Sequence, residues 1–217
     1  MELEIKKRVD NYLGFDSDRL FKSCDLVRIF GGAIRDSICG DPINDIDILV
    51  GSKSIRTVEH ILSLHGYTLI ESLIPKDLAS VYNDIQVISE PHTWMNGSKI
   101  VQLIRPRITQ PNYKTGAGLV MNPDTYTYKE NFNILISNVD LSCCGVSYDG
   151  NKVSEDYPNA ILHCRSKVFS VNQKAKMYSH KRIHHRTAKL EGRGWSMIDD
   201  TVSVNRDLKI DYLNKSI

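Results

Sequence analysis

The chain has 217 residues, of which 41% are hydrophobic, so it is long enough to bury the core of one large domain or of a domain with a small appendage. Its 28 Lys and Arg and 26 Asp and Glu give a formal net charge of only +2, which excludes a protein that binds polyanions through its overall charge. The sequence has no apolar run of transmembrane length, and its five cysteines include no Cys-x-x-Cys pair. We therefore expect a cytoplasmic protein with neither a membrane partner nor a zinc site.

Short helical and strand patterns alternate along the first half of the chain. Asn96-Gly97 and Asp149-Gly150 are hairpin turn signals. Alternating helices and strands with a hairpin predict an α+β fold, in which a small mixed β-sheet is backed by helices. Residues 106–124, rich in Pro and Gly, are expected to form a mobile connection. We expect helices at 2–13, 16–23 and 55–65, and strands at 26–30, 46–50, 68–71, 84–88 and 99–104.

Two adjacent glycines follow the first predicted strand and precede a short helix that opens at Ala33. Because glycine has no Cβ, Gly31 and Gly32 allow backbone N–H groups to approach a phosphate closely. The helix N-terminus adds a partial positive charge, and Arg35 one turn later can contact phosphate oxygens. A Gly-Gly pair by itself is more often a simple turn, so the phosphate interpretation depends on the residues that follow.

The second predicted strand carries Asp45 and Asp47 within the apolar run 43–50. Side chains at positions i and i+2 of a strand point to the same face, so the two carboxylates lie side by side. Two ionised carboxylates repel each other, and holding them in an apolar run costs free energy unless a cation neutralises them. Mg²⁺ binds oxygen ligands, typically one or two carboxylates together with substrate phosphates. This stretch therefore predicts phosphate chemistry.

The spacing of these residues resembles a motif of the nucleotidyltransferase superfamily (the polymerase-beta-like fold). The similarity is greatest to the head domain of class II tRNA nucleotidyltransferases and bacterial poly(A) polymerases. That family carries G-G-x-V-R-D, a glycine, and D-x-D ten residues after the arginine, where this chain has Gly31-Gly32-Ala33-Ile34-Arg35-Asp36, Gly40 and Asp45-Ile46-Asp47. The resemblance implies transfer of a nucleotide from a nucleoside triphosphate such as ATP. It also implies two Mg²⁺ ions on Asp45 and Asp47, with Gly32 and Arg35 at the triphosphate.

Two later segments match the family less closely. Residues 99–105 resemble its later strand, but Gln102 stands where the family usually has Glu, and an amide supplies no negative charge. The third metal ligand therefore stays open. Residues 138–149 loosely resemble R-R-D-F-T-x-N-A-L-A-Y-D, with uncharged residues in place of both arginines. This match implies a catalytic role for Asp140, which either supports the metal site or caps the helix that follows.

The C-terminal part carries a second functional signal. Residues 163–193 contain nine Lys and Arg against one acid, a local formal charge of +8 in a chain of net +2. This asymmetry favours an RNA backbone or a triphosphate as partner, and a solvated basic helix face is the plain alternative. A helix is predicted over 172–190, with Arg182 and Arg186 on one face. Its position resembles the family's neck helix, which implies nucleotide binding by both arginines, although the acidic residue of that template is absent.

These patterns predict a nucleotidyltransferase head domain at 1–160 and a short basic helical, neck-like extension and tail at 161–217. The function that they favour is transfer of a nucleotide to a hydroxyl at an RNA 3′ end, of the tRNA type, because the C-terminal segment is basic. Two alternatives stay open. One is a minimal transferase that modifies a protein or a small molecule, and the other is a catalytically silent module that binds nucleotide or RNA. The oligomeric state also stays open.

Overall fold

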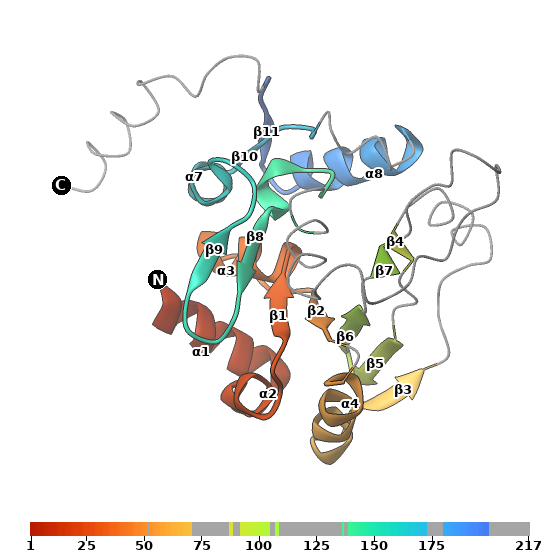
Figure 1. Cartoon of the computed structure of the whole chain (residues 1–217). Helices are drawn as coiled ribbons and strands as arrows, with labels where there is room; N and C mark the ends of the chain where they lie inside the picture. The colour runs from red at the N-terminus through yellow and green to blue at the C-terminus, as the bar shows by residue number, and fades with distance from the viewer. Residues whose placement is uncertain are drawn as a thin grey trace.

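The structure is a computed structural model that describes residues 1–51, 53–70, 87–88, 92–104, 107–108, 136, 139–172 and 180–199 (Figure 1). None of the helices within these ranges is long and apolar enough to cross a membrane. In chain order the elements are α1 (Glu2–Leu13), α2 (Asp18–Ser23), β1 (Val27–Phe30), α3 (Gly32–Cys39), β2 (Asp45–Val50), α4 (Ile55–Leu64), β3 (Thr68–Ile70), β4 (Val87–Ile88), β5 (His92–Asn96), β6 (Lys99–Ile104), β7 (Arg107–Ile108), the 3₁₀ helix η1 (Ser142–Cys144), β8 (Val146–Tyr148), β9 (Val153–Glu155), α7 (Ala160–Ser166), β10 (Val168–Phe169), α8 (His180–Glu191) and β11 (Ser196–Met197).

A seven-stranded sheet in the order β3-β5-β6-β2-β1-β8-β9 forms the centre of the fold (Figure 1). Strands β2 and β6 are parallel, and the other neighbouring strands in this sheet are antiparallel. Two small pairs lie outside it, β4 with β7 and β10 with β11. The predicted α+β architecture, a mixed sheet with helices, is confirmed.

Alternate side chains of β2 point to the two opposite faces of the sheet. Ile46, Ile48 and Val50 belong to the main hydrophobic cluster, which also contains buried side chains of α1, α3 and α4. Leu49 belongs to a smaller cluster with Phe30 and Ile136. Since side chains alternate along a strand, Asp45 and Asp47 share the face of Leu49. The two aspartates therefore lie on the face opposite the one that these helices cover.

The C-terminal elements pack into the same core as the N-terminal ones. Ala160 and Cys164 of α7, Phe169 of β10, Leu190 of α8 and the following Trp195 are all buried in the main cluster. Helix α8 contacts β11, which pairs with β10 (Figure 1). Residues on both sides of the predicted boundary at 160 thus share one hydrophobic cluster, and the division into head and extension stays a prediction.

The hairpin differs from the expected one in its first arm. A hairpin is confirmed here, with its turn one residue later than expected, at Gly97-Ser98, because Asn96 ends β5 opposite Lys99 of β6. The prediction that residues 84–88 form the first strand of this hairpin was wrong. A two-residue turn joins strands that end directly beside it, and 84–88 lie too far from the turn in sequence. Within that range β4 instead pairs with β7. Within the predicted helix 172–190, Asn172 is not helical and α8 spans His180–Glu191. Residues 173–179, like most of 106–124, lie outside the described residues.

Candidate active site

The carboxylates of Asp45 and Asp47 lie at the start of β2. Asp45 is exposed and Asp47 is half-buried, while Ile46 between them is fully buried on the other face. Asp47 lies opposite Phe30 of antiparallel β1 on one side and opposite Gln102 of parallel β6 on the other. Two carboxylates and one amide therefore share a sheet face, and this set of oxygen donors suits Mg²⁺.

The glycine turn lies at the same end of the sheet as these carboxylates. Phe30 ends β1 opposite Asp47, and α3 begins two residues later at Gly32. Gly31 has φ 71° and ψ −129°, a conformation that residues with a Cβ rarely adopt. A Cβ built on Gly31 would meet no atom of the described residues within 4 Å, so none of them covers the turn on that side. The turn thus presents the N-terminus of α3 beside the carboxylate face.

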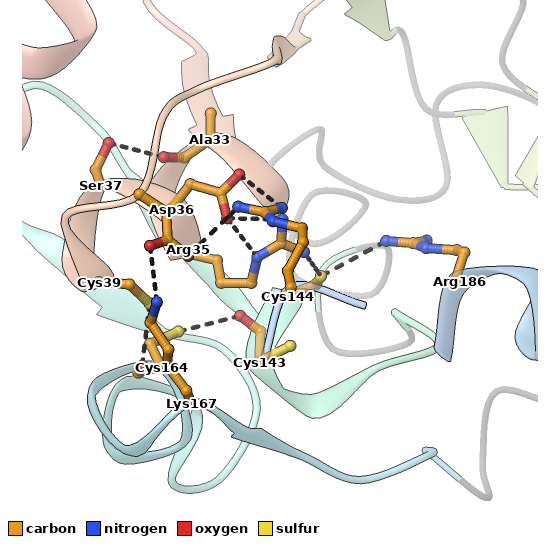
Figure 2. Close-up of polar contacts among 12 residues, drawn as sticks. Ala33, Arg35, Asp36, Ser37, Cys39, Cys143, Cys144, Cys164, Lys167 and Arg186 are labelled. Atoms are coloured by element: carbon orange, nitrogen blue, oxygen red, sulfur yellow. Dashed lines mark hydrogen bonds and ion pairs between the residues drawn. The ribbon is translucent and has the colours of Figure 1, made fainter. Parts of the chain in front are cut away.

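Arg35 lies inside the protein, on the inner side of α3. Its Nε donates to Asp36 Oδ1 at 2.7 Å, and its Nη1 donates to Cys144 Sγ at 3.3 Å (Figure 2). The guanidinium also lies over the ring of Trp195, 5.6 Å from its centroid. Burial by itself would lower the pKa of Arg35, but the charges of Cys144 and Asp36 outweigh burial and raise it. In this structure Arg35 therefore connects α3 to η1 and to the segment after α8.

Asp140 pairs with Arg186 across the fold. The Asp140 side chain is fully buried, and its Oδ1 and Oδ2 lie 2.7 and 2.9 Å from Arg186 Nη1. Helix η1 begins after Leu141 and has no side-chain cap, so the carboxylate of Asp140 holds α8 instead of capping η1. In the described part of the chain, no three His, Cys, Asp or Glu side chains come together in a metal-binding arrangement. Asp45, Asp47 and Asp140 therefore do not form a three-carboxylate cluster there.

The two predicted arginines of α8 are described to different extents. Arg186 reaches inward, and its Nη2 donates to Cys144 Sγ at 3.5 Å (Figure 2). Arg182 lies in the same helix, and its side chain is outside the described residues. A nucleotide-binding role for Arg182 stays a prediction from the sequence.

Sequence reasoning missed several residues that hold this region together. Asp36, only 2% exposed, accepts ion pairs from Arg35 and from Arg193, whose Nη2 is 3.1 Å from Asp36 Oδ1. The Cys144 thiol lies between two guanidinium groups. Two features of the sequence could have pointed to these contacts: Asp36 directly follows Arg35, and Arg193 and Trp195 lie in a glycine-rich stretch after the basic helix. Neither feature shows which residue the side chain contacts in the fold.

The chain is similar in structure to several solved proteins. No protein-family model and no curated protein matches the sequence. The structure is similar to an apo form of a CCA-adding enzyme, with a TM-score of 0.55 and 14% identity over 96% of this chain and 44% of that chain. A CCA-adding enzyme complex with ATP gives 0.54 and 13% identity over 90% and 40% of the two chains. A second apo form gives 0.53 and 16% identity over 90% and 42%.

These comparisons establish the nucleotidyltransferase fold, as the motif of residues 31–47 implied. The chain spans less than half the length of the solved proteins that it matches. The similarity extends well beyond residues 26–50, the segment on which the sequence resemblance is strong. It therefore supports the fold independently of the motif.

Proposed function

We propose that the chain is a Mg²⁺-dependent, template-independent nucleotidyltransferase. It transfers a nucleoside monophosphate from a nucleoside triphosphate to the 3′ hydroxyl of a tRNA-like RNA. One observation carries the proposal: Phe30, which precedes the glycine turn, pairs directly with Asp47. A cation on the carboxylates and a triphosphate on the turn would therefore be neighbours, as Mg²⁺-dependent phosphate chemistry requires.

The proposal gives each side chain a distinct task. Asp45 and Asp47 hold two Mg²⁺ ions, which when bound activate the acceptor hydroxyl and stabilise the leaving pyrophosphate. The N–H of Gly31 already donates to Val146 O at 3.0 Å, so the backbone from Gly32, where α3 begins, binds the phosphate oxygens. The buried Arg35 adds positive charge behind the turn. Asp140 serves as a positioning residue, because its buried carboxylate orients Arg186.

Two observations support a nucleoside triphosphate and an RNA as ligands. A solved protein of the same fold is a complex with ATP. The outer surface of α8 carries exposed His184, His185 and Lys189 within the segment of local charge +8. Such a surface suits a phosphate backbone. Asp140 and Cys144 already contact Arg186, so RNA binding is assigned to the exposed residues of α8.

Gln102 favours a second candidate function, a module that binds nucleotide without transferring it. The amide lies opposite Asp47 in the register of β6, so the oxygen donors on this face carry two formal negative charges from Asp45 and Asp47. Two carboxylates hold a metal–nucleotide complex less firmly than three. Binding without turnover would distinguish this candidate from the enzyme.

A labelled-nucleotide transfer assay tests the proposal. Purified protein is incubated with each of the four labelled ribonucleoside triphosphates and Mg²⁺, with and without total tRNA. The variants Asp45→Ala and Asp47→Ala are tested beside Asp25→Ala, which removes an exposed carboxylate elsewhere. We expect label on RNA with the parent protein and with Asp25→Ala, and none with either active-site variant.

The possible results separate the candidates. Label on the protein or on a small molecule would replace the RNA acceptor with the alternative acceptor class. Nucleotide binding with no transfer in any mixture would support the silent module. Unchanged turnover in Asp45→Ala or Asp47→Ala would show that the metal-site assignment is wrong.

A further inference from the structure

A continuous series of polar side chains joins α3, η1 and α8, with a buried middle at Cys144, Arg35 and Asp36 and partly exposed ends. Arg186 pairs with Asp140. Arg186 and Arg35 both donate to Cys144 (Figure 2). The series then passes from Arg35 to Asp36 at 2.7 Å and from Asp36 to Arg193 at 3.1 Å. It ends with Asp41, which contacts Arg193 at 3.4 Å and Lys167 at 2.8 Å. In order, the members are Asp140, Arg186, Cys144, Arg35, Asp36, Arg193, Asp41 and Lys167.

The signs of these charges alternate along the whole series if Cys144 is an anion. A neutral thiol would leave Arg35 and Arg186 as consecutive cations with no anion between them in this series. Their guanidinium groups both contact Cys144 Sγ, and Cys144 and Arg35 are only 1% and 7% exposed. Like charges that meet at a buried position are costly, and a thiolate at Cys144 removes that cost.

The groups around Cys144 favour the charged form of its sulfur. Arg35 Nη1 and Arg186 Nη2 donate to Sγ at 3.3 and 3.5 Å, from two different helices. A hydrogen bond from the Cys143 thiol and the two arginines lower the pKa of Cys144 to about 6, although burial and Asp140 act in the opposite direction. Burial and the same hydrogen bond raise the pKa of Cys143, and burial raises that of Cys164. Of these three buried thiols, Cys144 alone is stabilised as the anion.

We propose that Cys144 is ionised at neutral pH and is the anion that positions Arg35 of α3 beside Arg186 of α8. The ionisation does not depend on any function of the protein. The consequence for nucleotide binding rests on the function proposed above, in which Arg35 adds positive charge behind the glycine turn. Cys144 is then a positioning residue, which sets the distance between the head of the fold and its basic helix.

Thiolate absorbance at 240 nm tests the ionisation directly. The folded parent protein is titrated from pH 4.5 to 8.5 beside Cys144→Ser and the matched control Cys143→Ser, whose hydroxyl keeps a donor next to Cys144. We expect a step for one thiolate, centred near pH 6, in the parent protein and in Cys143→Ser, and no such step in Cys144→Ser. A parent protein without a step below pH 8, or a step that persists in Cys144→Ser, would overturn the proposal. If Cys144→Ser does not fold, the absence of a step below pH 8 in the parent protein still overturns the proposal.

Nucleotide affinity tests the positioning role. The Kd of a fluorescent ATP analogue with Mg²⁺ is measured for the parent, Cys144→Ser and Cys143→Ser at several pH values. We expect Cys144→Ser to bind about tenfold more weakly than the parent at pH 7.5, with the difference disappearing near pH 5 as the parent thiolate is protonated. A purely structural role would give a difference that does not change with pH.

The two measurements test the ionisation and the positioning role of Cys144 separately. Equal affinity of Cys144→Ser and the parent at pH 7.5 would overturn the positioning role while leaving a 240 nm step intact. Absence of nucleotide binding in every protein would refute the proposed function, and with it the positioning role. The ionisation of Cys144 would still be decided by its absorbance.

Discussion

Asp47 of β2 lies directly opposite Gln102 of the parallel strand β6. Their side chains share the sheet face that carries Asp45, so the proposed metal site has two carboxylates and one amide. Thr93 of β5 continues this row opposite Gln102, and it is buried. An amide oxygen can bind Mg²⁺ without contributing charge, and ligand charge strongly influences metal affinity. The register therefore identifies Gln102 as the position at which the charge of the site can be changed.

We predict that Gln102→Glu tightens divalent metal binding by about tenfold, because it adds a third carboxylate next to Asp47. The measurement is a Mn²⁺ titration followed by electron paramagnetic resonance, with no nucleotide present. Ser98→Glu adds the same charge at an exposed turn position and serves as control. Equal affinities for the two variants would mean that Gln102 does not face the metal site.

The carboxylate strand and the glycine turn were predictable because their signals are local. Asp45 and Asp47 interrupt an apolar run at strand spacing, and Gly31 has the positive φ that an adjacent glycine pair suggests. Both patterns can be recognised from residues that are adjacent in the sequence. The sequence therefore located the fold's characteristic segment to within a residue or two.

The glycine turn leads to a stability prediction. We expect Gly31→Ala to destabilise the fold by about 2 kcal/mol, since an alanine Cβ strains the backbone at φ 71° and ψ −129°. The described neighbours do not add to this cost, because a Cβ there would meet none of their atoms within 4 Å. Urea unfolding measures the effect. The control Gly40→Asn, at φ 77° and ψ 8°, should cost much less, because Asn tolerates the left-handed helical region.

The inward orientation of the arginines was not predictable from the sequence. Arg35 and Arg186 were expected at the triphosphate because arginine binds phosphate oxygens well. In the structure Arg35 pairs with the adjacent Asp36, but its other partner, Cys144, is distant in sequence. Arg186 contacts Asp140 and Cys144, which are both distant from it in sequence. Whether a cation faces a ligand or a protein anion depends on tertiary packing, about which charge patterns carry no information.

The pair between Arg186 and Asp140 leads to a second stability prediction. We expect Arg186→Met to cost about 3 kcal/mol, because it leaves a fully buried carboxylate without its ion pair. Arg186 is itself 31% exposed, so the value belongs at the low end of the range for buried pairs. The double variant Arg186→Met with Asp140→Leu should recover much of the loss, since no buried charge then remains.

Urea unfolding of the two single variants and the double variant gives the coupling energy by a double-mutant cycle. Lys22→Met provides the control, because it breaks the Lys22–Asp18 pair at 2.9 Å on a surface where Lys22 is 77% exposed. That loss should be much smaller than the loss in Arg186→Met, because water screens an exposed pair. A coupling energy near zero for Arg186 and Asp140 would contradict a structural role for their contact.

RNA binding should depend on the exposed side of α8 and not on Arg186. We predict that charge reversal at the exposed Lys189 weakens RNA binding and makes it less salt-dependent, with a slope reduced by roughly one for the phosphate contact that is lost. Filter binding across a salt series measures both quantities. Reversal at Lys22, on α2, is the control for a change in net charge. Affinity that does not change with salt in the parent protein would refute RNA binding by this surface.

Stability should rise with pH where Cys144 is ionised only in the folded state. The pKa of Cys144 is about 6 in the folded protein against an ordinary value of 9.0, so between these values the unfolded chain binds more protons. The stabilisation is fully present above pH 9, decreases as the pH falls and is lost below pH 6. At pH 7.5 it amounts to about 2 kcal/mol. Urea unfolding should therefore show Cys144→Ser less stable than the parent by about that amount at pH 7.5, and by almost nothing at pH 5. A difference that is the same at both pH values would show that the serine changes packing and not charge.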